Sequence, residues 1–598
     1  MNSRLEQEID AASLAVVRMV VALAAGWEVL RFVLADGIAT RLQNAQFLFT
    51  YPLFGFVRPL PGLLPYAFFA ALGLLVAAVL VGWQTRITSK LLAAGMLYWF
   101  LLDATAYSDH AYLLNLLLVL VAWLPVNRWM SSDCLMGREK RSSVPAWTLG
   151  LIRVQILLVY VHSGLSQLNG DWLRGAPLAE WLSLSAPGPV ANLASGSPAL
   201  AIGLAWLNVA FELSVGFLLW MPRTRRGALV AALLYHLLDA VWLHIGVSPV
   251  LMAAMSFAFC EPDWPRPVAE RLRTFLGAVP GTAFLGNMLC TAGRVIDRGV
   301  SWFDDTPVFG GAAIPKEQAE APRYILSEPV KYVVAAWLVV QIVVPLRQIV
   351  LPGPPEWTSF GSRFAWRGAK AEKQPRVELT LVQPDRQLSW VLDPLGEYPV
   401  PMELIADAAG LLSKNLDEGA LRDLVGGTED TLPLRIKGLG LEVAEADRLL
   451  RMYEDTDLLA LAPEEYLAML REPDLLRQYC ERVRIVMSSL LGRPVMVRAA
   501  TEMTLNHRPF APLIGARTDL SAVESAFDLG PVILPLKEPL PPYAERVERA
   551  RELIEERERE RALALPTSGE RRPPEPVKVP AFTDEDERWF EETYGTGK

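Results

Sequence analysis

Residues 235–266 read YHLLDAVWLHIGVSPVLMAAMSFAFCEPDWPR, a long apolar stretch with polar side chains near both ends and a break around Gly246 and Pro249. Together with the apolar residues that precede it from 227, this stretch predicts two closely spaced membrane spans, at 227–244 and 247–261. LLDATAYSDHAY at 101–112 and HSGLSQLNGDWLRG at 162–175 likewise place rare polar residues at the ends of apolar runs. The pattern predicts a polytopic membrane protein with polar groups gathered where its spans end.

The composition agrees with a membrane protein. Hydrophobic residues make up 52% of the 598 residues and the mean hydropathy is +0.25, which is too apolar for an ordinary soluble chain. The net charge of −9 lies mostly in the last third, and no basic cluster with interleaved aromatic residues is present. We therefore expect membrane lipid as the surroundings and no nucleic acid as a partner. No spacing of His, Cys, Asp or Glu typical of a metal site occurs, so no metal is predicted.

Apolar runs of span length predict a polytopic α-helical bundle of about nine transmembrane helices followed by an extramembrane α+β domain. The candidate spans lie at 13–35, 64–83, 88–105, 111–126, 146–168, 199–221, 227–244, 247–261 and 328–350. Positive charges mark the cytoplasmic loops, and they fall on one side if the N-terminus is cytoplasmic; they are Arg86, Lys90, Arg128, Arg138, Lys140, Arg141, Arg223, Arg225 and Arg226. An odd number of spans then places the C-terminal domain outside, in a periplasm, a lumen or the extracellular space.

Five parts follow from these patterns. They are a transmembrane domain at 1–261, a cytoplasmic connector at 262–327, a last transmembrane helix at 328–351, an extramembrane domain at 352–540, and a charged helix with a flexible tail at 541–598. Within the extramembrane domain the periodicity predicts strands at 377–382 and 495–505 and helices at 402–415, 442–455 and 463–482. Alternating Glu and Arg at 544–564 are typical of a solvated helix.

Histidines carry the strongest functional signal. The chain has only five, and four of them lie in or beside candidate spans: His110, His162, His236 and His244. An ionisable group in hydrocarbon costs a few kcal/mol, which makes it a marker of function or of pairing between helices. For any one histidine, a hydrogen bond to a neighbouring helix is a sufficient explanation. Four near the outer surface favour one ligand pocket there.

The segment 235–266 resembles the helix pair of the vitamin K-dependent γ-glutamyl carboxylases, which ends in a Cys-x-Pro-x-Trp-Pro-Arg motif, here CEPDWPR. Similar segments follow the order of the family from about residue 50 to 530: VRPLPG at 57–62, WQTRITS at 83–89, and the stretches 343–367 and 503–523. The resemblance implies the horizontally transferred transmembrane domain and a γ-glutamyl carboxylase-like lyase. Such an enzyme uses reduced vitamin K or another quinol, O₂ and CO₂ to carboxylate a glutamate in a protein or peptide.

In this family the base is a lysine in a segment similar to Gly-Val-Lys-Lys-Leu-x-x-x-Trp. Alignment on Gly164, Leu168 and Trp172 places Ser166 and Gln167 at the two lysines. A glutamine amide does not titrate in the useful range, so Gln167 can orient a quinol hydroxyl but cannot remove its proton.

The resemblance also assigns roles to other residues. It gives catalytic roles to Asp109, His110 and His236, with Gln167 at the position of the lysine. The polar or aromatic residues that remain near this site, His162, Trp172 and His244, are candidates for binding the ligand.

Three functions remain open from the sequence. The first, which we favour, is a carboxylase-like enzyme with altered chemistry. The second is a non-catalytic membrane binding protein, and the third is a subunit of a larger assembly. Gln167 argues against unmodified carboxylase chemistry, whereas His110 and His236 argue against complete loss of the site.

Overall fold

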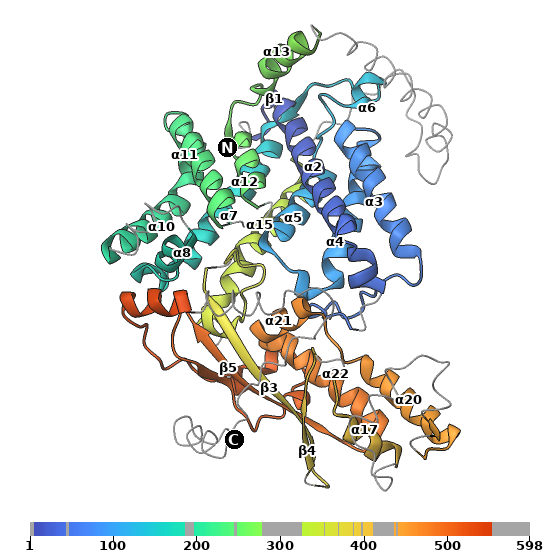
Figure 1. Cartoon of the computed structure of the whole chain (residues 1–598). Helices are drawn as coiled ribbons and strands as arrows, with labels where there is room; N and C mark the ends of the chain where they lie inside the picture. Colours follow the sequence, from blue (N-terminus) through green and yellow to red (C-terminus); the bar gives the residue numbers. More distant parts are fainter. Residues whose placement is uncertain are drawn as a thin grey trace, which may run out of the picture.

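The computed structural model describes a helical half and a half built around a β-sheet (Figure 1). The described residues are 5–43, 47–185, 197–243, 248–277, 326–351, 353–368, 370–386, 388–395, 399–410, 436–437 and 440–552. The helical half comes from the N-terminal part of the chain together with the segment that precedes the sheet. The sheet half lies at one end of the helices.

A helix occurs in each apolar run that was predicted to span the membrane. These helices are α2 (Ala12–Leu34), α3 (Leu64–Val81), α4 (Thr85–Leu102), α5 (Asp109–Trp123), α7 (Ala146–Ser166), α10 (Pro198–Trp220), α11 (Arg225–Leu238), α12 (Ser248–Ser256) and α15 (Glu328–Leu346). Within the described residues, five are long and apolar enough to cross a membrane: α2, α3, α7, α10 and α15 with its extension to Ile349. Of the others, α5, α11 and α12 are shorter, and α11 also begins with two arginines. The helix α4 carries Arg86 and Lys90 in its first turns. The structure thus supports an integral membrane protein, and the count of nine spans stays a prediction.

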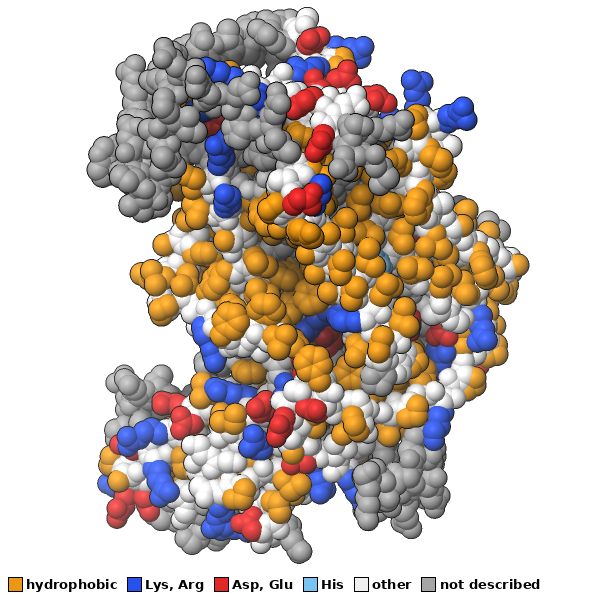
Figure 2. Space-filling model, turned by 180° about the vertical axis from the view of Figure 1, so that it is seen from behind, with side chains coloured by type: hydrophobic (Ala, Val, Ile, Leu, Met, Phe, Trp, Pro, Cys, Tyr) orange, Lys and Arg blue, Asp and Glu red, His pale blue; other side chains and the backbone are white. Residues whose placement is uncertain are grey.

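The outer surface of the helical half is apolar. Figure 2 shows a broad band of hydrophobic side chains across the middle of one face, with charged side chains above and below it. Exposed members of the helices include Leu74, Trp206, Leu207 and Val339. Only 11% of the residues in the most apolar part of α15 are buried, so most side chains of this helix face outward. Such a belt is suited to the hydrocarbon core of a bilayer.

The loops rich in positive charge gather at the end of the helices that is remote from the sheet (Figure 1). There, β1 (Glu8–Asp10) pairs with β2 (Ser143–Pro145), and α13 (Pro265–Gly277) is attached by an ion pair of 2.6 Å between Arg266 Nε and Asp10 Oδ2. The short helix α6 (Ser132–Leu135) carries Asp133, whose carboxylate accepts hydrogen bonds from the backbone at the start of α4. This grouping agrees with the prediction that the positively charged loops all lie on the same side of the membrane.

We therefore expect reporter fusions after residue 141 and after residue 540 to lie on opposite sides of the membrane. Residue 141 ends a positive loop, which stays in the cytoplasm, and residue 540 follows the strands of the sheet half. A fusion after residue 226 should match the fusion after residue 141. Protease protection or a compartment-sensitive reporter measures the sidedness. Equal sidedness at 141 and 540 would show that the odd number of spans is wrong.

The sheet is antiparallel, with strand order β4-β3-β5-β6. Its strands are β3 (Lys373–Gln383), β4 (Leu388–Leu392), β5 (Met496–Leu505) and β6 (Ala511–Ile514), and β3 pairs with β5 along almost its whole length. The helices α17 (Met402–Ala409), α20 (Val443–Asp457), α21 (Pro463–Arg471) and α22 (Pro473–Leu491) share an apolar core with the strands. Both predicted strands are confirmed. The helix predicted at 402–415 is described only to Ala409, because residues 411–415 lie outside the described ones.

The single helix predicted at 463–482 is wrong. Glu472 is extended, with φ −131° and ψ 111°, and separates α21 from α22. The cause is Pro473, because a proline ring disfavours the helical conformation of the residue before it.

The charged helix at the C-terminal end is not wholly solvated, contrary to the prediction. It begins at residue 543 and is described to residue 552. Arg546 donates from Nε to Glu180 Oε1 at 2.5 Å, and both side chains are buried. Glu180 belongs to α8 (Leu178–Ser185) in the helical half. Arg546 is buried because it pairs with the buried carboxylate of Glu180. The alternation of Glu and Arg along the sequence does not show that such a partner exists. The proposed flexible tail and most of the 262–327 connector lie outside the described residues.

Loops from the helical half enter the core of the sheet half. Phe49, Tyr51 and Ala104 pack in the same apolar core as the strands. Gln478 of α22 also exchanges hydrogen bonds of 2.9 and 3.0 Å with the backbone of Thr50. The two halves are therefore joined by a packed junction, and the candidate site lies beside it.

Candidate functional site

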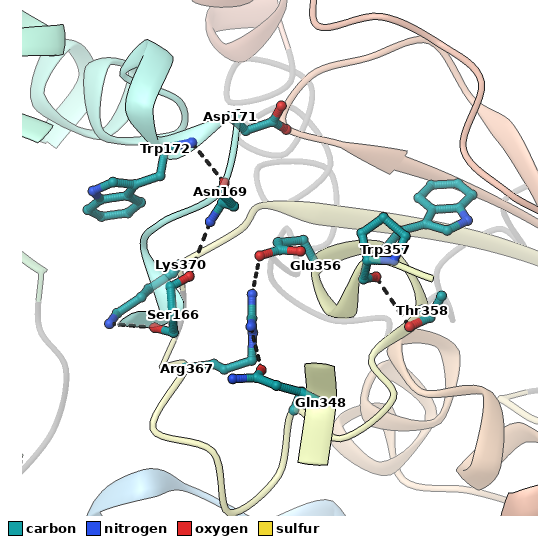
Figure 3. Close-up of polar contacts among 12 residues, drawn as sticks. Ser166, Asn169, Asp171, Trp172, Gln348, Glu356, Trp357, Thr358, Arg367 and Lys370 are labelled. Atoms are coloured by element: carbon teal, nitrogen blue, oxygen red, sulfur yellow. Dashed lines mark hydrogen bonds and ion pairs between the residues drawn. The ribbon is translucent and has the colours of Figure 1, made fainter. Parts of the chain in front are cut away.

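Lys370 reaches from the segment after α15 to the end of α7. Its Nζ donates to the carbonyl oxygen of Ser163 at 2.7 Å, to Ser163 Oγ at 2.6 Å and to Ser166 Oγ at 3.0 Å. Figure 3 shows the amine directed at Ser166. The carboxylate of Glu212 on α10 lies 3.5 Å away, and the Lys370 side chain is only 15% exposed. Burial lowers the pKa of Lys370, while the charges of Glu212 and Asp109 act in the opposite direction.

Asp109, the first residue of α5, holds the loop that carries Lys370. Its Oδ2 accepts from the backbone N–H of Gly368 at 2.7 Å, and its Oδ1 accepts from the Tyr107 hydroxyl at 2.7 Å. Tyr107 in turn accepts from the backbone N–H of Phe364 at 2.6 Å. Gly368 has a φ of +56°, a left-handed conformation that favours glycine. Asp109 is thus joined to the Lys370 loop through backbone contacts.

A second polar group connects α7, α10 and α11. Tyr235 donates to Glu212 Oε1 at 2.7 Å, so Glu212 contacts both Tyr235 and Lys370. The adjacent His236 has its Nε2 at 2.7 Å from the Tyr160 hydroxyl and its Nδ1 at 3.7 Å from Asp239 Oδ2. A carboxylate behind an imidazole and a phenol in front of it form an arrangement that can move a proton.

The segment that carries Lys370 is held at further points. Arg367 donates to Gln348 Oε1 at 2.5 Å and forms an ion pair with Glu356 (Figure 3). Lys373 donates to the carbonyl oxygen of Trp357 at 3.1 Å and to Ser359 Oγ at 2.6 Å. Burial lowers the pKa of Lys373 to about 7. The two lysines of this segment therefore have different partners. Lys370 contacts the end of α7, whereas Lys373 contacts Trp357 and Ser359.

Gln167, at the end of α7, is fully buried, and neither its Oε1 nor its Nε2 has a hydrogen-bond partner. Two other predicted residues of this segment also have buried ring nitrogens without a partner: Nε2 of His162 and Nε1 of Trp172. Leaving such a group unsatisfied costs about 1–3 kcal/mol. Each of these atoms could form a hydrogen bond with a hydroxyl or carbonyl group of a ligand.

The other predicted site residues lie in different surroundings. His110 has its Nε2 at 3.6 Å from Glu28 Oε1 of α2 and at 3.3 Å from Ser108 Oγ. Among the contacts of the described residues, none joins His110 to Lys370 or His236. His244 lies outside the described residues. The structure therefore links Asp109 and His236 to one polar region through Lys370 and Glu212, whereas His110 faces α2.

Sequence reasoning missed Lys370, Glu212, Tyr160 and Tyr235. Glu212 had a signal, since it interrupts the apolar run NVAFELSVG at 208–216, where a carboxylate needs a partner. Lys370 had none, because it stands among other charged residues in RGAKAEKQPR at 367–376. In the described parts of the chain, no group of three or more His, Cys, Asp or Glu is arranged to hold a metal ion.

Asp171, just beyond α7, is the point where β5 meets the helical half. Its carboxylate accepts from Arg508 at 2.6 and 2.8 Å and from Asn506 Nδ2 at 2.8 Å. Burial alone would raise the pKa of Asp171, but the hydrogen bonds and charge of Arg508 and Asn506 hold it below its usual value. This contact joins 162–175 to 503–523, two of the segments on which the resemblance rests.

Two family models match the chain and together cover more than half of it. The HTTM domain matches residues 6–264, and the lumenal domain of vitamin K-dependent gamma-carboxylase matches residues 326–399. No solved structure matches. The second match includes α15, the segment of Lys370, β3 and β4, and it suggests that the C-terminal part lies outside the membrane.

Proposed function

The chain belongs to the vitamin K-dependent γ-carboxylase family, and from this premise we propose that it is a carboxylase-type membrane enzyme that binds a quinol at the outer ends of its helices. Its N-terminus lies in the cytoplasm, and its substrate is a glutamate of a protein or peptide presented on the outer side. The observation that carries the proposal is the set of unpartnered, buried polar atoms on Gln167, His162 and Trp172.

These residues suit a quinol. The Oε1 of Gln167 can accept a hydrogen bond from a hydroxyl, and its Nε2 can donate to an oxygen. Nε2 of His162 and Nε1 of Trp172 each offer one more polar atom to the oxygens of a quinone head group. Reduced vitamin K bound there would supply, on its oxidation by O₂, the strong base that the reaction at glutamate needs.

The residues of the chain have separable roles in this proposal. Gln167 orients a hydroxyl and does not titrate. His236, supported by Asp239 and in contact with Tyr160, holds or moves a proton near the site. The apolar helices exclude water, which protects reactive species and strengthens each polar contact.

Replacing Gln167 with leucine tests the ligand site through two effects of opposite sign. The free protein should become more stable, because an unsatisfied buried amide is removed. The affinity for the quinone should fall roughly 5- to 150-fold, which corresponds to the loss of about 1–3 kcal/mol of hydrogen bonding. Thermal unfolding and equilibrium binding of the quinone, both in purified protein, measure the two effects.

The exposed Gln7→Leu serves as the control and should change neither quantity. Quinol epoxidation and fixation of labelled bicarbonate are assayed separately on the same protein. Binding without either activity would favour the non-catalytic binding protein. A Gln167→Leu protein that loses stability and keeps its affinity would show that the glutamine is only structural.

A further inference from the structure

We propose that Lys370 is the base of this site, an amine brought from the segment after the last span to the position where the family carries a lysine on the helix itself. The inference rests on the proposed quinol site and assigns the group that removes the proton of the quinol. The juxtaposition of Lys370 with Ser163, Ser166 and Glu212 carries it.

The amine lies at the place from which the family's lysine is missing. Ser166 aligns with one of the two lysines, and Nζ of Lys370 is 3.0 Å from its Oγ. Ser163 lies four residues before Gln167, so the two side chains share a face of α7. Because Nζ also lies 2.6 Å from Ser163 Oγ, it is on the face of the helix that carries Gln167. Chain segments about 200 residues apart thus combine a base with the glutamine that orients the ligand.

The contacts of Nζ suit either protonation state. An ammonium has four acceptors within reach: the carbonyl oxygen of Ser163, the hydroxyls of Ser163 and Ser166, and the carboxylate of Glu212. A neutral amine can in turn accept a hydrogen bond from the Ser163 hydroxyl, while the Ser166 hydroxyl donates to the Ser163 carbonyl oxygen at 2.7 Å. The site therefore does not fix Lys370 as an ammonium, as a simple structural ion pair would.

Charged groups from several elements influence Lys370. Glu212 of α10 and Asp109 of α5 favour the ammonium, and so does Asp239 after α11. Arg367 on the same segment and burial favour the neutral amine, and burial is the largest effect. The pKa of Lys370 is lowered as a result, which increases the fraction of neutral amine near neutral pH.

The proposed step is a proton transfer. The lone pair of neutral Lys370 Nζ forms an N–H bond with the proton of a quinol hydroxyl. The O–H bond breaks, and its electron pair stays on the oxygen. The resulting ammonium is held by Glu212 and the two serines until it returns the proton to solvent. No oxidant is needed for this step, and the later oxidation uses the O₂ of the proposed reaction.

Lys370→Gln is expected to lower kcat for quinol epoxidation by roughly 10²- to 10⁴-fold, the usual contribution of a general base. Quinone affinity should change only a few-fold, because Gln167 remains. The double variant Lys370→Gln with Gln167→Lys should recover much of the rate, since it returns an amine to the face of α7. Rates, affinities and unfolding temperatures are measured on the same preparations.

Lys373→Gln is the matched control, because it removes another buried amine from the same segment, one that contacts Trp357 and Ser359. It should lower stability and reduce kcat far less than Lys370→Gln does, because Lys373 contacts Trp357 and Ser359 and not the end of α7. Loss of kcat in Lys373→Gln with an active Lys370→Gln would overturn the proposal. Unaltered kcat in Lys370→Gln, with intact quinone binding in the wild type, would overturn it too. Absence of quinone binding in the wild type would instead refute the proposed function.

A second measurement does not depend on turnover. Acylation of single lysines by an amine-reactive reagent, followed by mass spectrometry across pH, should show that Lys370 becomes reactive at lower pH than the exposed Lys437. Glu212→Gln should move this transition of Lys370 to still lower pH, because a carboxylate that favours the ammonium is removed. The acid limb of the epoxidation profile should move with it. The proposal would be contradicted if Lys370 became reactive at the same pH as Lys437, or if Glu212→Gln left the transition of Lys370 unchanged.

Discussion

Replacing Asp171 with alanine is expected to lower the free energy of unfolding by about 3–5 kcal/mol, because it leaves the buried guanidinium of Arg508 without its carboxylate. Both side chains are largely buried, with exposed fractions of 7% for Arg508 and 14% for Asp171. The contact is bidentate, and Asn506 donates to the same carboxylate. Its loss should also loosen the attachment of β5 to the helical half. Denaturant unfolding in detergent and proteolysis of the outer domain measure the two effects.

The double variant Asp171→Ala with Arg508→Leu provides the internal test. It should recover most of the lost stability, since replacing both members of a buried pair by apolar groups is often neutral. Asp385→Ala is the surface control, because Asp385 and Arg493 lie 4.0 Å apart and are about half exposed; we expect a change within about 0.5 kcal/mol. A loss at Asp171 no larger than the loss at Asp385 would show that the contact does not hold the two halves together.

The Asp171 contact also predicts a dependence on pH. Its folded-state pKa is held below the ordinary value of 3.8. The stabilisation is therefore fully present above that ordinary value and is lost as the pH falls through the lower pKa of the folded protein. Asp171→Ala should remove this part of the acid sensitivity.

His236→Ala is expected to reduce quinol epoxidation by roughly 10²- to 10⁴-fold, because it removes the group that can exchange a proton with Tyr160. The imidazole lies between Tyr160 and Asp239, at 2.7 Å from the phenol and 3.7 Å from the carboxylate. Steady-state kinetics across pH, with quinone affinity measured in parallel, separates a loss of chemistry from a loss of binding.

Tyr160→Phe removes the partner of His236 but keeps the ring, so it should give a smaller loss in the same direction. His110→Ala is the informative comparison, because His110 faces Glu28 of α2 rather than the Lys370 contacts. We expect it to have less effect on kcat than His236→Ala. If His236→Ala keeps the stability and the full activity of the wild type, the histidine has no role in the reaction and only connects two helices.

Much of the architecture could be predicted from local sequence. Each apolar run contains a helix, and the strands β3 and β5 lie where alternation of apolar residues predicts them. The family was also predicted, because CEPDWPR and the other similar segments occur in one order along the chain. Proline at 473 was visible in the sequence, but the apolar pattern on both sides hid the break between α21 and α22.

The candidate site could be predicted only in part. Asp109, Gln167 and His236 are polar residues in or beside apolar runs, and the resemblance to the family assigned their roles. Lys370 and Arg546 were missed because charge is common around them, and a charged side chain in polar surroundings gives no local sign of burial. Arg546 was even expected in solvent, although it pairs with the buried Glu180.

By itself the sequence determined a membrane-embedded helical half, a separate sheet half and the family to which the chain belongs. Hydrophobic length and periodicity act over 10 to 20 neighbouring residues, so they can be recognised without knowledge of the fold. Only the tertiary structure decided that Lys370 meets Ser163, Ser166 and Glu212, that Arg508 meets Asp171, and that His110 faces α2. Each of these contacts joins residues far apart in the chain, because a buried charge is stabilised by whichever partner the packing of helices and strands brings within a few ångströms.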